Sequence, residues 1–437
     1  MYNKLKLGDI LKKALLVAVE KDEEVASNSL DELNNLLQTI GIKEEARIIQ
    51  KALKFNPKTY VGQGKLEELL IYVEEYNVDY VVFDDELTPA QIYNLDEAIP
   101  CSVLDRSYVI LEIFRQTAST PLAKLEVELA NLNYLYPRLK TFHEGFDRQG
   151  GGIGSKGSGE TQLELDKRAL ANQILVTKRK IEEIKSRKVN EVNKRVDTNI
   201  KSVALVGYTN AGKSSTMNAL LSYLNKYEYK NNVDNKNVEA EDKLFKTLST
   251  SVRKLTYKNV SFLLSDTIGF INKIPAELVN SFLTTLLEAK NADLIIIVLD
   301  ASSKNVDSEF MTTIQTLDYL QINNPNILLL LNKIDKLETY NKSIQIPKFD
   351  TLIYSNKDEN YQKNLLDYIY KFVTKDYEIM DLTVPYSDPK IINQIETYTN
   401  VISKTYMSEY VLYKVNAPKH IARLLALYKS DDDLIIS

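Results

Sequence analysis

Residues 202–215 read SVALVGYTNAGKSS, and this stretch decides the fold class of the chain. The apolar run 203–206 predicts a buried strand that leads directly into the pattern G-x-x-x-x-G-K-[ST]. In such a loop the glycines let backbone N–H groups surround phosphate oxygens, the lysine reaches the β- and γ-phosphates, and the serine binds Mg²⁺. The residues predicted to contact a nucleotide here are Gly207, Tyr208, Thr209, Asn210, Ala211, Gly212, Lys213, Ser214 and Ser215.

A glycine turn between a strand and a helix is the alternative interpretation, and a second motif downstream argues against it. The strand-like run 261–264 leads to Asp266, Thr267, Ile268 and Gly269, a D-x-x-G pattern. A carboxylate at the end of a second strand can hold the Mg²⁺ shell, and the N–H of the glycine can sense a γ-phosphate. At this interval after a phosphate loop, the motif predicts a nucleotide-dependent switch.

A third motif predicts which base is bound. Residues 294–299 and 327–331 are apolar runs typical of parallel strands, and the second leads to Asn332, Lys333 and Asp335. Guanine presents two adjacent donors that one carboxylate can accept, so Asp335 selects guanine. Asn332 is expected to brace the loop and the stem of Lys333 to cover the base. A last loop that could meet the base edge contains Ser355, Asn356 and Lys357.

Composition limits the function classes. With 437 residues the chain is long enough for two to four domains, and 44% apolar with 26% charged residues is ordinary for a globular protein. The single Cys101 permits no internal disulfide and suggests a reducing compartment. The longest apolar runs are too short to cross a bilayer, and no signal peptide is recognised. A net charge of −5 means that any RNA contact must come from local basic patches.

The remaining segments predict three more parts. Before residue 117, short apolar runs alternate with amphipathic stretches, which predicts a small parallel α/β domain. Leucine and isoleucine stripes over residues 122–135 and 161–196 predict two long helices in an antiparallel hairpin. The tail predicts a strand, a helix, two strands and a helix.

The connection between the two long helices is rich in glycine, and two interpretations of it stay open. A flexible connector is one. The other is a loop whose backbone approaches RNA, because Arg148 and Lys156 lie within it and the following helix is rich in Lys and Arg.

At this point the chain resembles the HflX family of ribosome-associated GTPases. The similar segments are GYTNAGKSS (207–215), DKLFKTL (242–248), DTIGF (266–270), NKID (332–335) and RQGGGIGSKGSGETQLE (148–164). The resemblance implies an α/β fold in four parts. They are an N-terminal α/β domain (1–116), a helical hairpin with its glycine-rich loop at 145–159 (117–199), a Ras-like GTPase domain (200–375) and a small α/β domain (376–437).

The resemblance also implies a function. It implies hydrolysis of GTP to GDP and phosphate with Mg²⁺, binding to the large ribosomal subunit and intact ribosomes through residues 145–159 and the basic hairpin, and rescue or splitting of stalled ribosomes. We expect a monomer in the cytoplasm, in part at the membrane. Besides Lys213 and Gly269, Phe270 bears on catalysis, because it stands where Ras-like enzymes carry a water-orienting glutamine. Slow intrinsic hydrolysis with help from a partner is therefore expected.

Two details of the metal sites stay open. Ser214 and Asp266 are the predicted Mg²⁺ ligands, with Ser251 at the position of the switch threonine and Thr250 as its alternative. Asn210 resembles the asparagine of GTPases assisted by K⁺.

A nucleotide-sensing RNA-binding protein with little turnover is the alternative function, and a small-molecule P-loop kinase is disfavoured by the guanine motif.

Overall fold

The computed structural model describes residues 12–139, 158–196, 200–227, 251–267, 269–273, 287–322, 326–337 and 349–430, with side chains of the long helix described for 164–187. The chain forms two compact units. The first comprises Met1–Asn193, Glu241–Ser249 and Phe270–Leu286, and the second comprises Lys194–Ala240, Thr250–Gly269 and Leu287–Ser437. The division into four parts stays a prediction. The glycine-rich loop up to residue 157, Thr250 and Ile268 lie outside the described residues.

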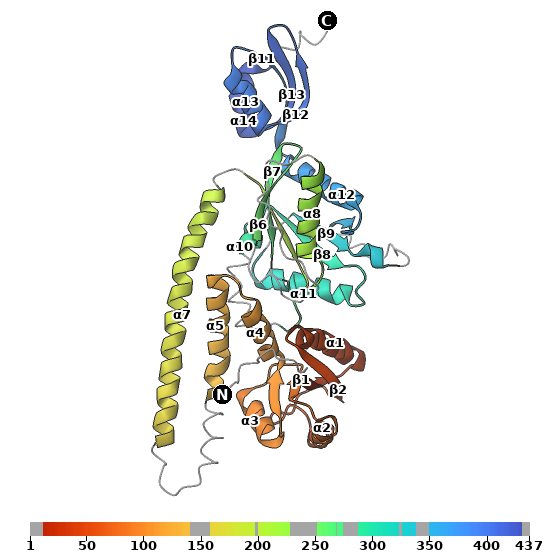
Figure 1. Cartoon of the computed structure of the whole chain (residues 1–437), viewed down its shortest axis with the longest axis vertical. Helices are drawn as coiled ribbons and strands as arrows, with labels where there is room; N and C mark the ends of the chain where they lie inside the picture. The colour runs from red at the N-terminus through yellow and green to blue at the C-terminus, as the bar shows by residue number, and fades with distance from the viewer. Residues whose placement is uncertain are drawn as a thin grey trace. The chain divides into compact units, whose positions relative to one another are not determined.

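The N-terminal domain is built on a parallel sheet, as predicted, and this sheet has four strands (Figure 1). Its strand order is β2-β1-β3-β4. The strands are β1 (Lys12–Glu20), β2 (Ile42–Lys51), β3 (Tyr80–Phe83) and β4 (Ser102–Asp105), and the helices are α1 (Glu23–Thr39), α2 (Gln63–Tyr76), α3 (Pro89–Ala98) and α4 (Arg106–Thr117). The sequence analysis gave no strand at β2 and no helix at α4.

Helices cover both faces of this sheet because its strands are apolar on both sides. Leucines and valines of α2 and α3 share one hydrophobic core with Leu15, Val17, Val81 and Phe83. Helix α1 contacts α4 and the strands β1 and β2. The chain order places the topological switch point between β1 and β3, since β2 was added on one side and β3 on the other.

Two further helices belong to the same unit. Helix α5 spans Pro121–Leu135 and α7 spans Ser158–Val196, so both predicted helices form. They run side by side in opposite directions (Figure 1), with Gln173 donating to Glu128 and Lys185 paired with Glu126. Thr120 caps α5 by accepting from the N–H of Ala123.

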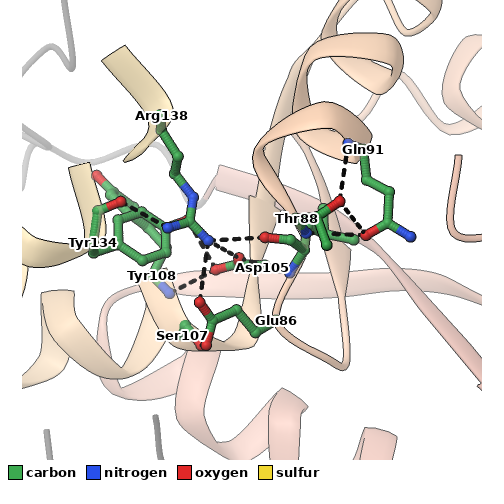
Figure 2. Close-up of polar contacts among 9 residues, drawn as sticks. Glu86, Thr88, Gln91, Asp105, Ser107, Tyr108, Tyr134 and Arg138 are labelled. Atoms are coloured by element: carbon green, nitrogen blue, oxygen red, sulfur yellow. Dashed lines mark hydrogen bonds and ion pairs between the residues drawn. The ribbon is translucent and has the colours of Figure 1, made fainter. Parts of the chain in front are cut away.

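A buried arginine ties the end of α5 to the carboxyl end of β4 (Figure 2). Arg138 lies in the short 3-10 helix η1 (Tyr136–Arg138), directly after α5, and its guanidinium is stacked 3.6 Å from the ring centre of Tyr134. It donates to the carbonyl of Leu87 at 2.8 Å and lies 3.7 Å from Asp105. Asp105 is fully buried and accepts from Tyr108 N–H and Tyr134 O–H. Burial raises the pKa of Asp105 to about 6.

A six-stranded sheet in the order β10-β9-β8-β5-β7-β6 carries the nucleotide motifs. All neighbouring strands are parallel except the edge strand β6, which is antiparallel to β7. The strands are β5 (Ser202–Gly207), β6 (Ser251–Tyr257), β7 (Val260–Asp266), β8 (Leu294–Asp300), β9 (Ile327–Asn332) and β10 (Asp350–Ile353). The helices are α8 (Lys213–Tyr227), α10 (Leu287–Lys290), α11 (Val306–Tyr319) and α12 (Glu359–Val373), with the 3-10 turn η2 (Ile334–Lys336).

The core of this sheet lies between its strands and two helices. Leucines of α8 and α12 pack on Val203, Leu205 and Val298 in one cluster of fully buried side chains. Helix α11 contacts β5 and β8. The strand order reverses beside β5, so the loop that follows β5 lies at the switch point where ligands bind in such sheets.

The tail contains the predicted succession of a strand, a helix, two strands and a helix, and its strands form a three-stranded antiparallel sheet in the order β11-β13-β12. Its elements are β11 (Tyr377–Pro385), α13 (Pro389–Tyr398), β12 (Asn400–Tyr406), β13 (Tyr410–Pro418), α14 (Lys419–Leu425) and the turn η3 (Ala426–Tyr428). Leu382, Tyr413 and Leu425 lie in its core.

Candidate functional site: a guanine nucleotide pocket

The loop between β5 and α8 needs its two glycines for different reasons. Gly207 has φ +143°, and a Cβ there would lie 2.2 Å from the carbonyl oxygen of Val298. Gly212 has φ +98°, and a Cβ there would lie 2.2 Å from Nδ2 of Asn332. The first position therefore excludes a side chain because of the neighbouring strand, and the second because of the predicted guanine motif.

Lys213 begins α8 and turns back over the loop. Its Nζ donates to the carbonyls of Gly207 at 3.0 Å and Tyr208 at 2.7 Å. Burial lowers the pKa of Lys213 to about 8, although Asp266 opposes this shift. A phosphate would restore the charged form, so the buried ammonium is prepared for an anion.

Ser214 and Asp266, the two predicted Mg²⁺ ligands, lie in direct contact. The hydroxyl of Ser214 donates to Oδ2 of Asp266 at 2.6 Å. Asp266 is fully buried, and its Oδ1 has no hydrogen-bond partner among the described residues. Burial raises the pKa of this carboxyl, against the effect of Ser214 and Lys213. A divalent cation would relieve both costs, and hydroxyl and carboxylate oxygens are the ligands that Mg²⁺ prefers.

The third predicted metal ligand is less directly placed. Ser251 begins β6 and is the register partner of Asp266 on β7. Its hydroxyl lies 3.6 Å from the sulfur of Met217. The structure therefore brings Ser251 beside the pair without directing its oxygen at Ser214, and the choice between Ser251 and Thr250 stays a prediction.

The D-x-x-G motif crosses the phosphate loop at close range. The hydroxyl of Thr267 donates to the carbonyl of Leu205 at 2.7 Å, which fixes the motif to β5. A Cβ on Gly269 would lie 2.8 Å from Cα of Thr209 and 2.9 Å from Nζ of Lys213. The backbone of Thr209 therefore excludes a side chain at this position, and the N–H of Gly269 is proposed to contact a γ-phosphate bound by Lys213.

The predicted guanine motif is tied to the phosphate loop. Asn332 is fully buried, and its Nδ2 donates to the carbonyl of Ala211 at 2.8 Å. Lys333 has φ +61°, and its Nζ donates to the carbonyl of Asn210 at 2.6 Å. These hydrogen bonds join the loop that carries the guanine motif directly to the phosphate loop.

The last loop meets the guanine-selecting carboxylate. Ser355 donates to Oδ1 of Asp335 at 2.8 Å, and Nζ of Lys357 lies 2.6 Å from its Oδ2. The hydrogen bond from Lys357 is the largest cause that holds the pKa of Asp335 below its usual range. Asp335 is therefore an ionised acceptor. Asn356 lies close to Gly212.

The sequence analysis missed one residue of this pocket. Asp300 ends β8, and its Oδ2 pairs with Nζ of Lys333 at 2.7 Å. It also accepts from the N–H and the hydroxyl of Ser302. Asp300 thus holds the lysine whose stem is expected to cover the base. Its position directly after an apolar strand, at the carboxyl edge of the sheet, was the signal that could have identified it.

Comparison with known proteins agrees with this geometry. Residues 27–115, 117–195 and 202–333 match the family models described as GTP-binding GTPase N-terminal, GTP-binding GTPase Middle Region and 50S ribosome-binding GTPase. A GTPase HflX of Flavobacterium psychrophilum is 42% identical over 73% of this chain and 74% of its own length. A GTPase HflX of Lacrimispora saccharolytica is 33% identical over 98% of both chains.

The chain belongs to the HflX family of GTPases. A GTPase HflX of Escherichia coli is 35% identical over 79% of this chain and 77% of its own. Among solved structures, a GTP-binding protein of Sulfolobus solfataricus in complex with GDP aligns over 83% of this chain and 99% of its own, with 24% identity and a TM-score of 0.42.

As an HflX-family enzyme the chain hydrolyses GTP, and its residues divide the work. Lys213 and the backbone of the phosphate loop would bind and orient the phosphates, while Asp335 would bind the guanine edge. Ser214 and Asp266 would hold Mg²⁺, which would neutralise charge that develops on the phosphates. Within the described residues, no helix is both long and apolar enough to span a membrane.

Proposed function

We propose that this GTPase binds the large ribosomal subunit and intact ribosomes, and that it rescues or splits stalled ribosomes in the cytoplasm as a monomer. The match of residues 202–333 to a family model described as 50S ribosome-binding GTPase carries this proposal. The exposed basic side chains of α7, among them Lys178, Arg179 and Lys180, support it, because they suit the phosphates of ribosomal RNA. Residues 145–159 are the proposed contact to the catalytic centre of the subunit.

The intrinsic rate of hydrolysis is proposed to be low. Phe270 is 3% exposed, and its ring can neither accept a proton nor align a water molecule through a hydrogen bond. A ribosomal group would supply this alignment. If it does not, the protein is a nucleotide sensor with little turnover, in which GTP only sets the state of the hairpin.

Potassium is proposed as a second cation, because Asn210 occupies the loop position typical of cation-assisted GTPases. Asn210 has φ +59° and an exposed side chain, while its carbonyl is held by Lys333. Hydrolysis should be faster in KCl than in NaCl at equal ionic strength. Equal turnover in the two salts would refute this role.

Sedimentation with purified ribosomes tests the proposal. The protein should pellet with large subunits and intact ribosomes in a non-hydrolysable GTP analogue, and less with GDP. A Gly151→Ala/Gly152→Ala variant should pellet less while binding GTP normally. Density-gradient sedimentation then distinguishes ribosome splitting from ribosome binding, because splitting converts intact ribosomes into subunits and binding alone does not. Failure to pellet with either particle in any nucleotide would refute ribosome binding.

A further inference from the structure

The residues after the D-x-x-G motif belong to a different compact unit from the motif itself. Gly269 is grouped with the nucleotide-binding sheet, whereas the residues that follow are grouped with the N-terminal sheet. Phe270 and Ile271 are buried, at 3% and 1% exposure. Lys273 follows with φ +56°. The chain therefore passes from one unit to the other directly after the residue predicted to sense the γ-phosphate.

Lys273 forms two ion pairs inside the first unit. Its Nζ contacts Oδ2 of Asp84 and lies 2.7 Å from Oδ1 of Asp85. Asp84 is buried, and Asp85 also accepts from the hydroxyl of Tyr60. Burial lowers the pKa of Lys273, but the two carboxylates outweigh that effect and raise it. The lysine is therefore charged whenever the pair is formed.

The two aspartates occupy a special place in the N-terminal sheet. They directly follow β3, beside the switch point between β1 and β3 where ligands bind in folds of this kind. Asp84 also accepts from Arg106 at 2.8 Å, and Arg106 pairs with Glu32. Three carboxylates thus share Arg106 and Lys273. Loss of the lysine would leave them with one of these two cations.

A movement of Gly269 is transmitted through a short segment of chain to the ion pairs of Lys273. Lys273 follows Gly269 by four positions, which span at most about 14 Å even when fully extended. The two residues after Gly269 are buried, so they offer little slack. A Cβ on Gly269 would lie 2.9 Å from Nζ of Lys213, so a γ-phosphate bound by this lysine would also lie near Gly269 and could draw its N–H closer.

We propose that Lys273 is a positioning residue for Gly269. Its ion pairs with Asp84 and Asp85 hold the residues after Gly269 on the N-terminal domain and oppose a shift of Gly269 toward the γ-phosphate. The pairs therefore weaken GTP binding relative to GDP binding. By reciprocity, GTP loosens this contact and so reports the nucleotide state to the N-terminal domain. The proposal rests on the GTPase site and is independent of any ribosome.

Dissociation constants for GDP and for a non-hydrolysable GTP analogue test it in the full-length protein. Lys273→Gln and Asp85→Asn should each shift the ratio of the two constants at least about five-fold toward the GTP analogue, the lower end of typical coupling effects. GDP affinity should stay the same. The double variant should behave like either single one, and Lys273→Arg should retain the wild-type ratio.

The matched control is Lys51→Gln, which removes an exposed ion pair with Glu23 on the same domain. It should leave the ratio unchanged. If Lys273→Gln and Asp85→Asn also leave the ratio unchanged, or if they alter GDP and GTP-analogue binding equally, the positioning role is wrong. Thermal unfolding establishes whether each variant is folded. If Lys273→Gln does not fold, the nucleotide affinities of Asp85→Asn decide whether the ion pair has the positioning role.

Discussion

The proposed specificity of the nucleotide site depends on single side chains, and Asp335 is the clearest case. Its carboxylate is ionised and held by Ser355 and Lys357, so it can accept both donors of the guanine edge. Asparagine would present one donor and one acceptor, which match xanthine, where a carbonyl replaces the amino group. Asp335→Asn should shift preference from GTP toward XTP by at least about 100-fold, since mismatched polar groups are strongly rejected. Competition binding of the two nucleotides measures this, and an unchanged preference would contradict the assignment.

Lys213 gives a pH prediction at the same scale. Burial lowers its pKa to about 8, so the lysine of the free protein loses its charge as pH rises through 8, whereas bound phosphate favours the charged form. GTP binding should therefore be accompanied by proton uptake, which rises from about 0.2 proton per GTP at pH 7.5 to about 0.8 at pH 8.5. Calorimetry in two buffers of different ionisation enthalpy measures the uptake. No increase between these pH values would mean that the ammonium is not buried as described.

At the scale of secondary-structure elements, the sequence predicted the buried strands but not all of the edge strands. Buried strands such as β5 and β9 are plain apolar runs, and the loops after them carry recognisable motifs. The edge strands β2 and β6 were missed, because charged residues such as Glu44, Arg47 and Lys254 interrupt their apolar pattern. Charges protect exposed edges from pairing, so edge strands are poorly marked by hydrophobicity. Asp300 was missed because its role depends on Lys333, which only the folded sheet brings near.

The junction of α5 with the N-terminal sheet depends on one buried cation. Arg138→Ala should cost about 3–5 kcal/mol of unfolding free energy, because it leaves buried Asp105 without its cation. Arg47→Ala, which removes a partly exposed arginine that pairs with Glu44, should cost less than about 1 kcal/mol. Urea unfolding followed by circular dichroism compares the variants. Equal losses would show that the buried cluster contributes no more than a surface pair.

At the scale of the whole molecule, we propose a GTPase that needs a partner to complete its catalytic site. The pocket supplies binding and orientation, while Phe270 supplies no means of aligning water. Lys273 pairs with Asp84 of the N-terminal domain, and we propose that this contact holds the residues after Gly269. A ribosome that binds the N-terminal domain and the hairpin would therefore change the conformation of the nucleotide site. Ribosome binding and the positioning role of Lys273 are compatible, and neither proposal depends on the other.

The most direct measurement is GTP hydrolysis by the purified protein, alone and with large subunits or intact ribosomes. We predict a slow basal rate, stimulation of at least about ten-fold by ribosomes, as expected when a partner supplies a missing catalytic group, and loss of most of this stimulation in the Gly151→Ala/Gly152→Ala variant. The basal rate of that variant should be unchanged. A rate that neither particle alters would contradict the account, and would leave a GTPase whose partner is not the ribosome.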